Sequence, residues 1–269
     1  MKYKVIVLDL DGTLTNSKKE ISPRTYSALI EAQEKGVVLV LASGRPTYGI
    51  TPLAKQLQMD KFGGYILSFN GGKIINYKTK ETIMEQTLEQ ELLPWLYNLS
   101  KKSETTIVSY SPNGKEIFTE NPDDSYAMHE AKINKMEIRG VKSFIEAISH
   151  APNKCLIVGE PEKLIPIESH INEKEGHRMS AFRSEPFFLE LVPKGIDKAL
   201  SLERLLSVIG HKREEMIAIG DGYNDLTMIR YAGLGVAMEN AQPEVKEAAD
   251  HITLSNDNDG IAHLLDKIM

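Results

Sequence analysis

Residues 3–17 read YKVIVLDLDGTLTNS, an apolar run that ends in two closely spaced carboxylates. The run from Val5 to Leu10 has the composition of a strand buried on both faces, interrupted by Asp9. Asp11 follows two positions later, beside a glycine that permits a tight turn. Two carboxylates a few Å apart repel each other by about 4 kcal/mol at an effective dielectric constant of about 20. The pair therefore needs a cation or a shared proton, and we favour a functional site over two solvated loop side chains.

Short apolar runs alternate with helix-patterned segments at both ends of the chain. Strands are expected at KVIVLDL, VVLVLAS, YILSFN, MIAIG and LGVAM, which are residues 4–10, 37–43, 65–70, 216–220 and 234–238. Helices are expected between them, including one capped by Ser22 and one capped by Asp197. Apolar strands separated by helices predict a parallel sheet that is covered on both faces.

The middle of the chain follows a different pattern. Residues 81–186 alternate more between polar and apolar positions, and residues 105–121 indicate a hairpin with its turn at Pro112, Asn113 and Gly114. We therefore predict an α+β domain at 81–186, inserted into one domain formed by 1–80 and 187–269. The predicted fold class is α/β, with a Rossmann-like, doubly wound parallel-sheet core.

Composition excludes several classes of protein. Apolar residues make up 41% and charged residues 26% of the 269, with a formal net charge of −6. This charge argues against binding to nucleic acid or to an anionic membrane surface. Cys155 is the single cysteine, so no intrachain disulfide is possible, and its apolar surroundings favour a buried, inert thiol. The early apolar run is too short for a signal peptide or a membrane helix, and we expect a cytoplasmic protein.

A second acidic stretch follows another predicted strand. MIAIGDGYNDL, residues 216–226, places Asp221, Asn224 and Asp225 directly after apolar residues. Ligands of a parallel α/β sheet bind beyond the carboxyl ends of its strands, which is where both acidic stretches lie. Carboxylate and carbonyl oxygens suit Mg²⁺, whereas a lone cysteine and scattered histidines do not suit zinc.

The first acidic stretch also has carboxylates at the positions of a calcium-binding EF-hand loop. That loop needs a glycine where Leu14 stands and a helix in front, where the sequence predicts a strand. We exclude this alternative.

Two further stretches supply groups that bind phosphate. LASGRP places the hydroxyl of Ser43 and the backbone amide of Gly44 at the end of a predicted strand. PKGIDK supplies Lys194 and Lys198 near the start of a helix, and lysine is a natural phosphate partner beside an acidic metal site.

In order along the chain, DLDGTL, ASGR, KGIDKAL and GDGYNDL resemble the four motifs of the haloacid dehalogenase superfamily. SFNGG and VAMENAQPEVKEAADHIT are similar to further stretches of its Cof-type, sugar-phosphatase-like branch. The resemblance spans nearly the whole chain. It implies that residues 81–186 form a cap domain that selects the substrate.

The resemblance also implies a role for each motif residue. Asp9 would be the nucleophile that forms an aspartyl-phosphate, and Asp11 the general acid and base. The phosphate would be bound by Ser43, Gly44, Lys198 and Asn224, the substrate by Arg45, and Mg²⁺ by Asp9, Asp11, Asp221 and Asp225. Lys194 remains the alternative to Lys198, because the branch has a glycine where Ala199 follows here.

The sequence thus predicts a Mg²⁺-dependent phosphatase that acts on small phosphorylated metabolites, sugar phosphates first. An aspartate at position 11 also fits a phosphomutase or phosphotransferase, and the third alternative is a non-enzymatic ligand-binding module. The physiological substrate and the oligomeric state are not encoded in any motif that we identified.

Overall fold

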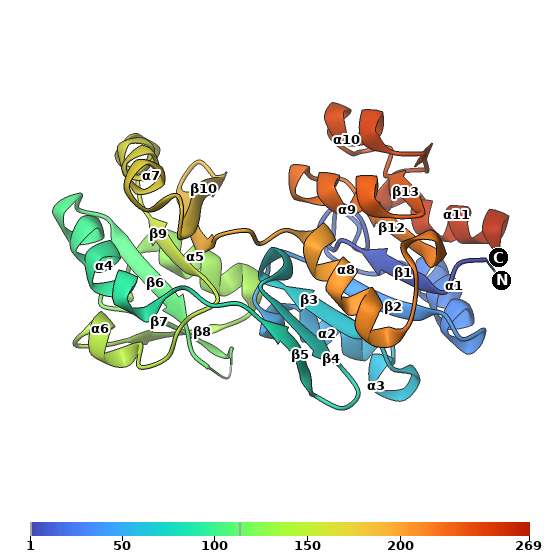
Figure 1. The fold of residues 1–269 in the computed structure, drawn as a ribbon, viewed down its shortest axis with the longest axis horizontal. Helices are drawn as coiled ribbons and strands as arrows, with labels where there is room; N and C mark the ends of the chain where they lie inside the picture. The colour runs from blue at the N-terminus through green and yellow to red at the C-terminus, as the bar shows by residue number, and fades with distance from the viewer. Residues whose placement is uncertain (1, 113) are drawn as a thin grey trace. The chain divides into compact units, whose positions relative to one another are not determined.

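The computed structural model describes residues 2–112 and 114–269 and divides into two units (Figure 1). The first unit comprises Met1–Gly44, Ile50–Met84 and Asp197–Met269. The second comprises Arg45–Gly49 and Glu85–Ile196. Among the described residues, no helix is both long enough and apolar enough to span a membrane.

The first unit is built on an eight-stranded sheet. Its strands are β1 (Val5–Leu8), β2 (Val38–Ala42), β3 (Tyr65–Ser68), β4 (Lys73–Asn76), β5 (Thr82–Glu85), β12 (Met216–Gly220), β13 (Leu234–Ala237) and β14 (His251–Ile252). The strand order is β14-β13-β12-β1-β2-β3-β4-β5, and the pairs from β14 to β3 are parallel. β4 runs antiparallel to β3, so the sheet is mixed. β4 and β5 lie outside the strands that the sequence predicts.

The strand order reverses direction between β1 and β12. From β1 the chain continues to β2 and β3 on one side, and from β12 to β13 and β14 on the other. Such a switch point opens a crevice at the carboxyl ends of the two central strands.

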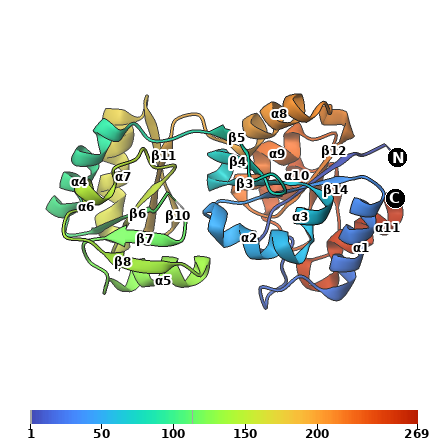
Figure 2. The same cartoon turned by 90° about the horizontal axis from the view of Figure 1, so that it is seen from below.

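Alternate residues of each central strand enter two separate cores, which is why these strands are apolar throughout. Ile6 and Leu8 of β1 enter one core, whereas Val5 and Val7 enter the other. The helices with all or most of their residues in this unit are α1 (Pro23–Glu34), α2 (Thr47–Gln56), α3 (Met59–Phe62), α8 (Lys198–Ile209), α9 (Leu226–Tyr231), α10 (Pro243–Ala248) and α11 (Gly260–Ile268). Helices α1 and α11 pack on one face and α8 and α9 on the other (Figure 2).

Short 3₁₀ turns join several of these elements: η1 (Phe69–Gly71), η3 (Arg213–Glu215), η4 (Tyr223–Asp225) and η5 (Asn256–Asn258). The predicted helix starts are confirmed. The Ser22 hydroxyl accepts a hydrogen bond from the Thr25 amide, and the Asp197 carboxylate accepts one from the Leu200 amide.

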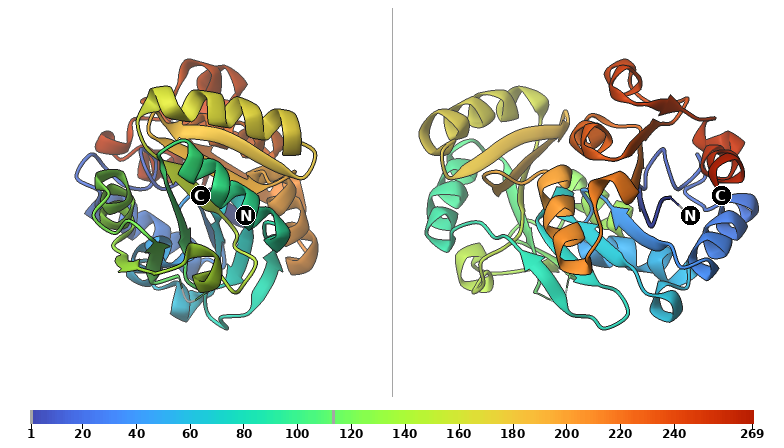
Figure 3. Two further views of the ribbon diagram at one scale, coloured as in Figure 1. Left: turned by 90° about the vertical axis from the view of Figure 1, so that its left-hand side faces the viewer. Right: turned by 45° about the vertical axis from the view of Figure 1, so that its right-hand side comes forward.

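The second unit has a six-stranded sheet in the order β10-β11-β9-β6-β7-β8. Its strands are β6 (Thr106–Tyr110), β7 (Glu116–Thr119), β8 (Glu137–Gly140), β9 (Cys155–Val158), β10 (Met179–Glu185) and β11 (Phe188–Pro193). Its helices are η2 (Gln90–Leu92), α4 (Leu93–Lys102), α5 (Ser125–Asn134), α6 (Phe144–Ala147) and α7 (Pro161–Glu175). Helices α4 (green) and α7 (yellow) lie over this sheet, and their apolar residues share a core with it (Figure 3).

Two predictions about the second unit can be compared with its structure. β6 and β7 form the expected antiparallel pair, while Asn113 at the predicted turn lies outside the described residues. The predicted boundary at 186/187 needs correction. β11 pairs with β9 and β10, so the second unit extends to Ile196. The α/β class is confirmed.

Candidate active site

Asp9 stands directly after β1, on a rigid part of the backbone. β1 is flanked by β2 and β12, and the Asp9 amide continues the ladder by donating to the Ile219 carbonyl over 3.0 Å. The side chain of Asp9 is buried. A carboxylate in this position is fixed by the sheet and does not depend on a mobile loop for its placement.

Asp221 stands after the neighbouring strand β12, against the loop that follows Asp9. The Thr13 hydroxyl donates to Asp221 Oδ1 over 2.6 Å. Gly12 has a φ of +85°, and a Cβ added there would lie 2.3 Å from Asp221 Oδ2. Only glycine therefore fits at position 12, for reasons of both space and backbone conformation.

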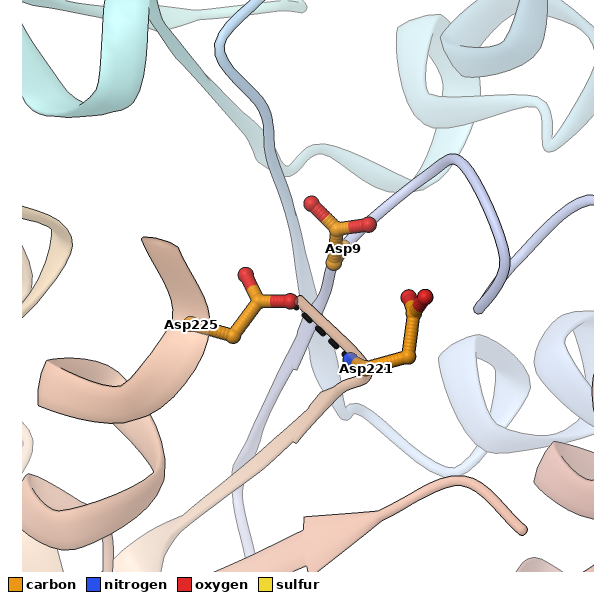
Figure 4. A group of neighbouring side chains, drawn as sticks. All are labelled: Asp9, Asp221 and Asp225. Carbon is orange, nitrogen blue, oxygen red and sulfur yellow. Dashed lines mark hydrogen bonds between the residues drawn. The ribbon is translucent and has the colours of Figure 1, made fainter. Parts of the chain in front are cut away.

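Asp225 is fully buried and holds the loop after β12 in place. Its Oδ2 accepts hydrogen bonds from the backbone amides of Asp221, over 3.0 Å, and of Gly222, over 2.9 Å. Figure 4 shows the first of these, with Asp9, Asp221 and Asp225 gathered at the ends of β1 and β12. The three side chains can bring one oxygen each within 4.8 Å of the others.

Lys198, at the start of α8, connects these carboxylates. It is fully buried, and its Nζ donates to Asp9 Oδ1 over 2.7 Å, to Asp225 Oδ1 over 2.6 Å and to the Ala42 carbonyl over 2.9 Å. These bonds use all three ammonium hydrogens. Lys194 is exposed and belongs to the second unit.

The cluster carries more negative charge than Lys198 can balance. Burial, together with the charge of Asp225, raises the pKa of Asp9 well above its ordinary value. Burial raises the pKa of Asp221 to about 6. Burial also opposes the charged form of Lys198, but Asp225 and Asp9 outweigh it and raise the pKa of Lys198 above its ordinary value. Three carboxylates beside one ammonium group favour the binding of a cation.

The donor set fits Mg²⁺, which prefers hard oxygen ligands. Asp9 and Asp221 can offer carboxylate oxygens directly. Both oxygens of Asp225 already accept hydrogen bonds, so Asp225 is better suited to orient the site than to bind a metal directly.

Four further residues with predicted roles lie in different surroundings. Asp11 is partly exposed, and its Oδ1 accepts from Lys19 Nζ over 2.8 Å. Ser43 is buried at the end of β2, where its amide donates to the Leu67 carbonyl. Asn224 is exposed in η4. Arg45 falls in the second unit.

Two residues of the site lie outside the sequence prediction. Thr13 binds Asp221, and Asn70 lies against Gly44 and accepts a hydrogen bond from Asn224 over 3.0 Å. A hydroxyl directly after Asp-Gly was a usable signal for Thr13. The role of Asn70 depends on contacts between distant segments, which the motif SFNGG does not reveal.

The chain matches the family model of the haloacid dehalogenase-like hydrolases over residues 6–265. It belongs to this family. A crystal structure of a haloacid dehalogenase-like hydrolase from Bacteroides thetaiotaomicron has 58% sequence identity to the chain and a TM-score of 0.96, and the match covers 100% of both chains.

Two other relatives are named for the kind of compound that they act on. A Bacillus subtilis 5-amino-6-(5-phospho-D-ribitylamino)uracil phosphatase, YcsE, has 30% sequence identity to this chain. The match covers 96% of this chain and 93% of YcsE. The subclass IIB sugar phosphatase BT4131 is 25% identical with a TM-score of 0.81, over 98% of both chains. The predicted superfamily and its Cof-type branch are confirmed, and both relatives are named as members of the predicted enzyme class, the phosphatases.

Proposed function

We propose that this protein is a Mg²⁺-dependent phosphatase that hydrolyses phosphomonoesters of small metabolites through an aspartyl-phosphate on Asp9. The observation that carries the proposal is the contact of Lys198 Nζ with Asp9 Oδ1, inside a cluster that also contains Asp221 and Asp225. A buried carboxylate of this kind, with one oxygen held by a lysine, can present its other oxygen to an electrophile.

In the first step, an Asp9 oxygen attacks phosphorus and the bond from phosphorus to the leaving oxygen breaks. Asp11 gives its proton to the departing alkoxide, which leaves as an alcohol. In the second step, Asp11 takes a proton from water as the water oxygen attacks phosphorus. Inorganic phosphate leaves, and the Asp9 carboxylate is regenerated.

Other side chains bind and orient the phosphoryl group. Ser43, the Gly44 amide and Asn224 offer hydrogen-bond donors, and Lys198 holds positive charge where negative charge gathers in the transition state. Mg²⁺ held by Asp9 and Asp221, with the Asp11 carbonyl and support from Asp225, would neutralise charge on the transferring group.

The substrate class is proposed from the relatives. One acts on a phosphorylated ribityl compound and another is named a sugar phosphatase, so we propose phosphorylated sugars and polyols of the cytoplasm. We further propose that the second unit, with Arg45, selects the leaving group.

The proposal is tested by phosphate release from a panel of sugar phosphates, polyol phosphates, nucleotides and p-nitrophenyl phosphate, with and without Mg²⁺. We expect Mg²⁺-dependent turnover that falls at least about a thousandfold in Asp9→Asn, because the nucleophile is lost. Asp60→Asn, which changes an exposed aspartate of α3, is the matched control and should behave like wild type. Wild-type protein without turnover on the whole panel would contradict the proposal, and transfer to an added alcohol in place of water would indicate a phosphotransferase.

A further inference from the structure

The turn η1, residues Phe69–Gly71, follows β3 with an unusual backbone. Phe69 and Asn70 have φ values of +53° and +55°, and Gly71 has +110°. A positive φ costs a non-glycine residue about 1–3 kcal/mol, and such strain persists where surrounding contacts fix it. The contacts of this turn therefore indicate what the strain maintains.

The first contacts of the turn are with the end of β2. The Asn70 amide donates to the Ser43 carbonyl over 2.9 Å. The Asn70 side chain lies against Gly44, where an added Cβ would be 3.1 Å from Nδ2. Asn70 thus contacts both residues that follow β2 in the site.

The next contact is with η4. Asn224 Nδ2 donates to Asn70 Oδ1 over 3.0 Å. The opposite side of the same amide lies against Gly222, where an added Cβ would be 2.7 Å from Asn224 Oδ1. Since an amide nitrogen carries two hydrogens, the bond to Asn70 fixes one and thereby orients the other.

The last contact is with the start of α8, which carries Lys198. The Ser201 hydroxyl donates to the Gly71 carbonyl over 2.9 Å, and a Cβ on Gly71 would lie 2.5 Å from that hydroxyl. The turn therefore touches three separate parts of the unit, the Ser43–Gly44 segment after β2, η4 and α8, and each of them carries a proposed phosphate-binding group.

We propose that Asn70 is a positioning residue, which fixes Asn224 and the Ser43–Gly44 segment in one arrangement for binding the phosphoryl group. This inference rests on the proposed phosphatase function. Asn70 does not react. It acts through Asn224, whose exposed side chain would otherwise sample several rotamers.

The test compares Asn70→Gly, Asn224→Ala and the double variant. Glycine adopts a positive φ freely, so Asn70→Gly removes the amide and retains the backbone conformation. Lys80→Gly is the matched control, because Lys80 also has a positive φ of +64° and lies in the turn between β4 and β5. The readouts are kcat/KM, competitive inhibition by inorganic phosphate with Mg²⁺ present, and the ¹⁵N signals of the Asn224 side-chain amide.

We expect each single variant to lower kcat/KM and phosphate affinity about tenfold, and the double variant to lower them by about the same factor, because the two residues act as one unit. Lys80→Gly should match wild type. The Asn224 amide signals should shift in Asn70→Gly. Effects that multiply in the double variant, or unchanged phosphate inhibition in Asn70→Gly, would overturn the inference.

Failure of the proposed function gives a different pattern. If wild-type protein releases no phosphate from any substrate, the phosphatase proposal falls, and the amide signals still decide the role of Asn70. Asn224 signals that are identical in wild type and Asn70→Gly would then overturn the positioning role by themselves.

Discussion

The ammonium group of Lys198 lies 2.7 Å from Oδ1 of Asp9, and the Lys198 side chain has no exposed surface. A second buried carboxylate, that of Asp225, accepts from the same nitrogen over 2.6 Å. Each of these three side chains therefore has a buried partner of opposite charge. Stability and the proposed chemistry therefore depend on the same three side chains.

Replacement of Lys198 by methionine should lower the free energy of unfolding by about 3–5 kcal/mol at pH 7.5, because two buried carboxylates lose their cation. Chemical denaturation measures this loss. Lys194→Met, at an exposed lysine, should change the free energy of unfolding by less than about 0.5 kcal/mol and should retain turnover. Equal effects of the two substitutions would show that Lys198 does not have the role that we propose.

Gly12→Ala should cost more than about 2 kcal/mol of stability and should weaken Mg²⁺ binding, because a Cβ at 2.3 Å would displace the Asp221 carboxylate. Gly36→Ala is the matched control. Gly36 has nearly the same φ, +84°, but nothing within 4 Å of an added Cβ, so only the conformational cost of about 1–2 kcal/mol remains. Thermal unfolding and Mg²⁺ titration compare the two variants. Equal losses of stability and of Mg²⁺ affinity in both variants would contradict the prediction.

Mg²⁺ affinity should fall as the pH is lowered through about 6, the raised pKa of Asp221. A carboxylate binds a metal ion only when it is deprotonated, so protons compete with Mg²⁺ below that pH. Calorimetric titrations should give an Mg²⁺ affinity about tenfold lower at pH 5.0 than at pH 7.5, because one proton on Asp221 competes with the metal ion. Equal affinity at the two pH values would contradict a role for Asp221 as a ligand.

The stability of the metal-free protein should depend on pH in the opposite direction. Protonation of Asp221 weakens Mg²⁺ binding but stabilises the folded state. Because the folded pKa of Asp221, about 6, exceeds the ordinary value of 3.8, the folded state binds more protons than the unfolded state between these values. The contribution of Asp221 to stability therefore increases as the pH falls from 7 toward 4.

Asp221→Asn removes that contribution while its side-chain oxygen can still accept from Thr13. We expect the variant to be more stable than wild type at pH 7.5, with the difference vanishing near pH 4. Unfolding curves across this range, recorded with a metal chelator, test the sign. A variant that is less stable than wild type at pH 7.5 would be evidence against the raised pKa.

Local features of the fold could be predicted from local sequence. The apolar run that ends at Asp9 forms β1, and Ser22 and Asp197 cap α1 and α8, because composition, capping and strand length act within a few residues. The position of both acidic stretches after strands followed from the same patterns. The unit to which β11 belongs was harder to predict, because its pairing with β9 and β10 depends on residues far away in the chain.

The sequence by itself determined that acidic residues follow two apolar strands and which family the fold belongs to, and it predicted residues for the proposed chemistry. Only the tertiary structure decided which of these residues meet. It placed β1 beside β12, put Lys198 between Asp9 and Asp225, and joined Asn70 to Asn224. The physical reason is that strand order and side-chain contacts between distant segments follow from the packing of the whole core, to which each short motif contributes only a part.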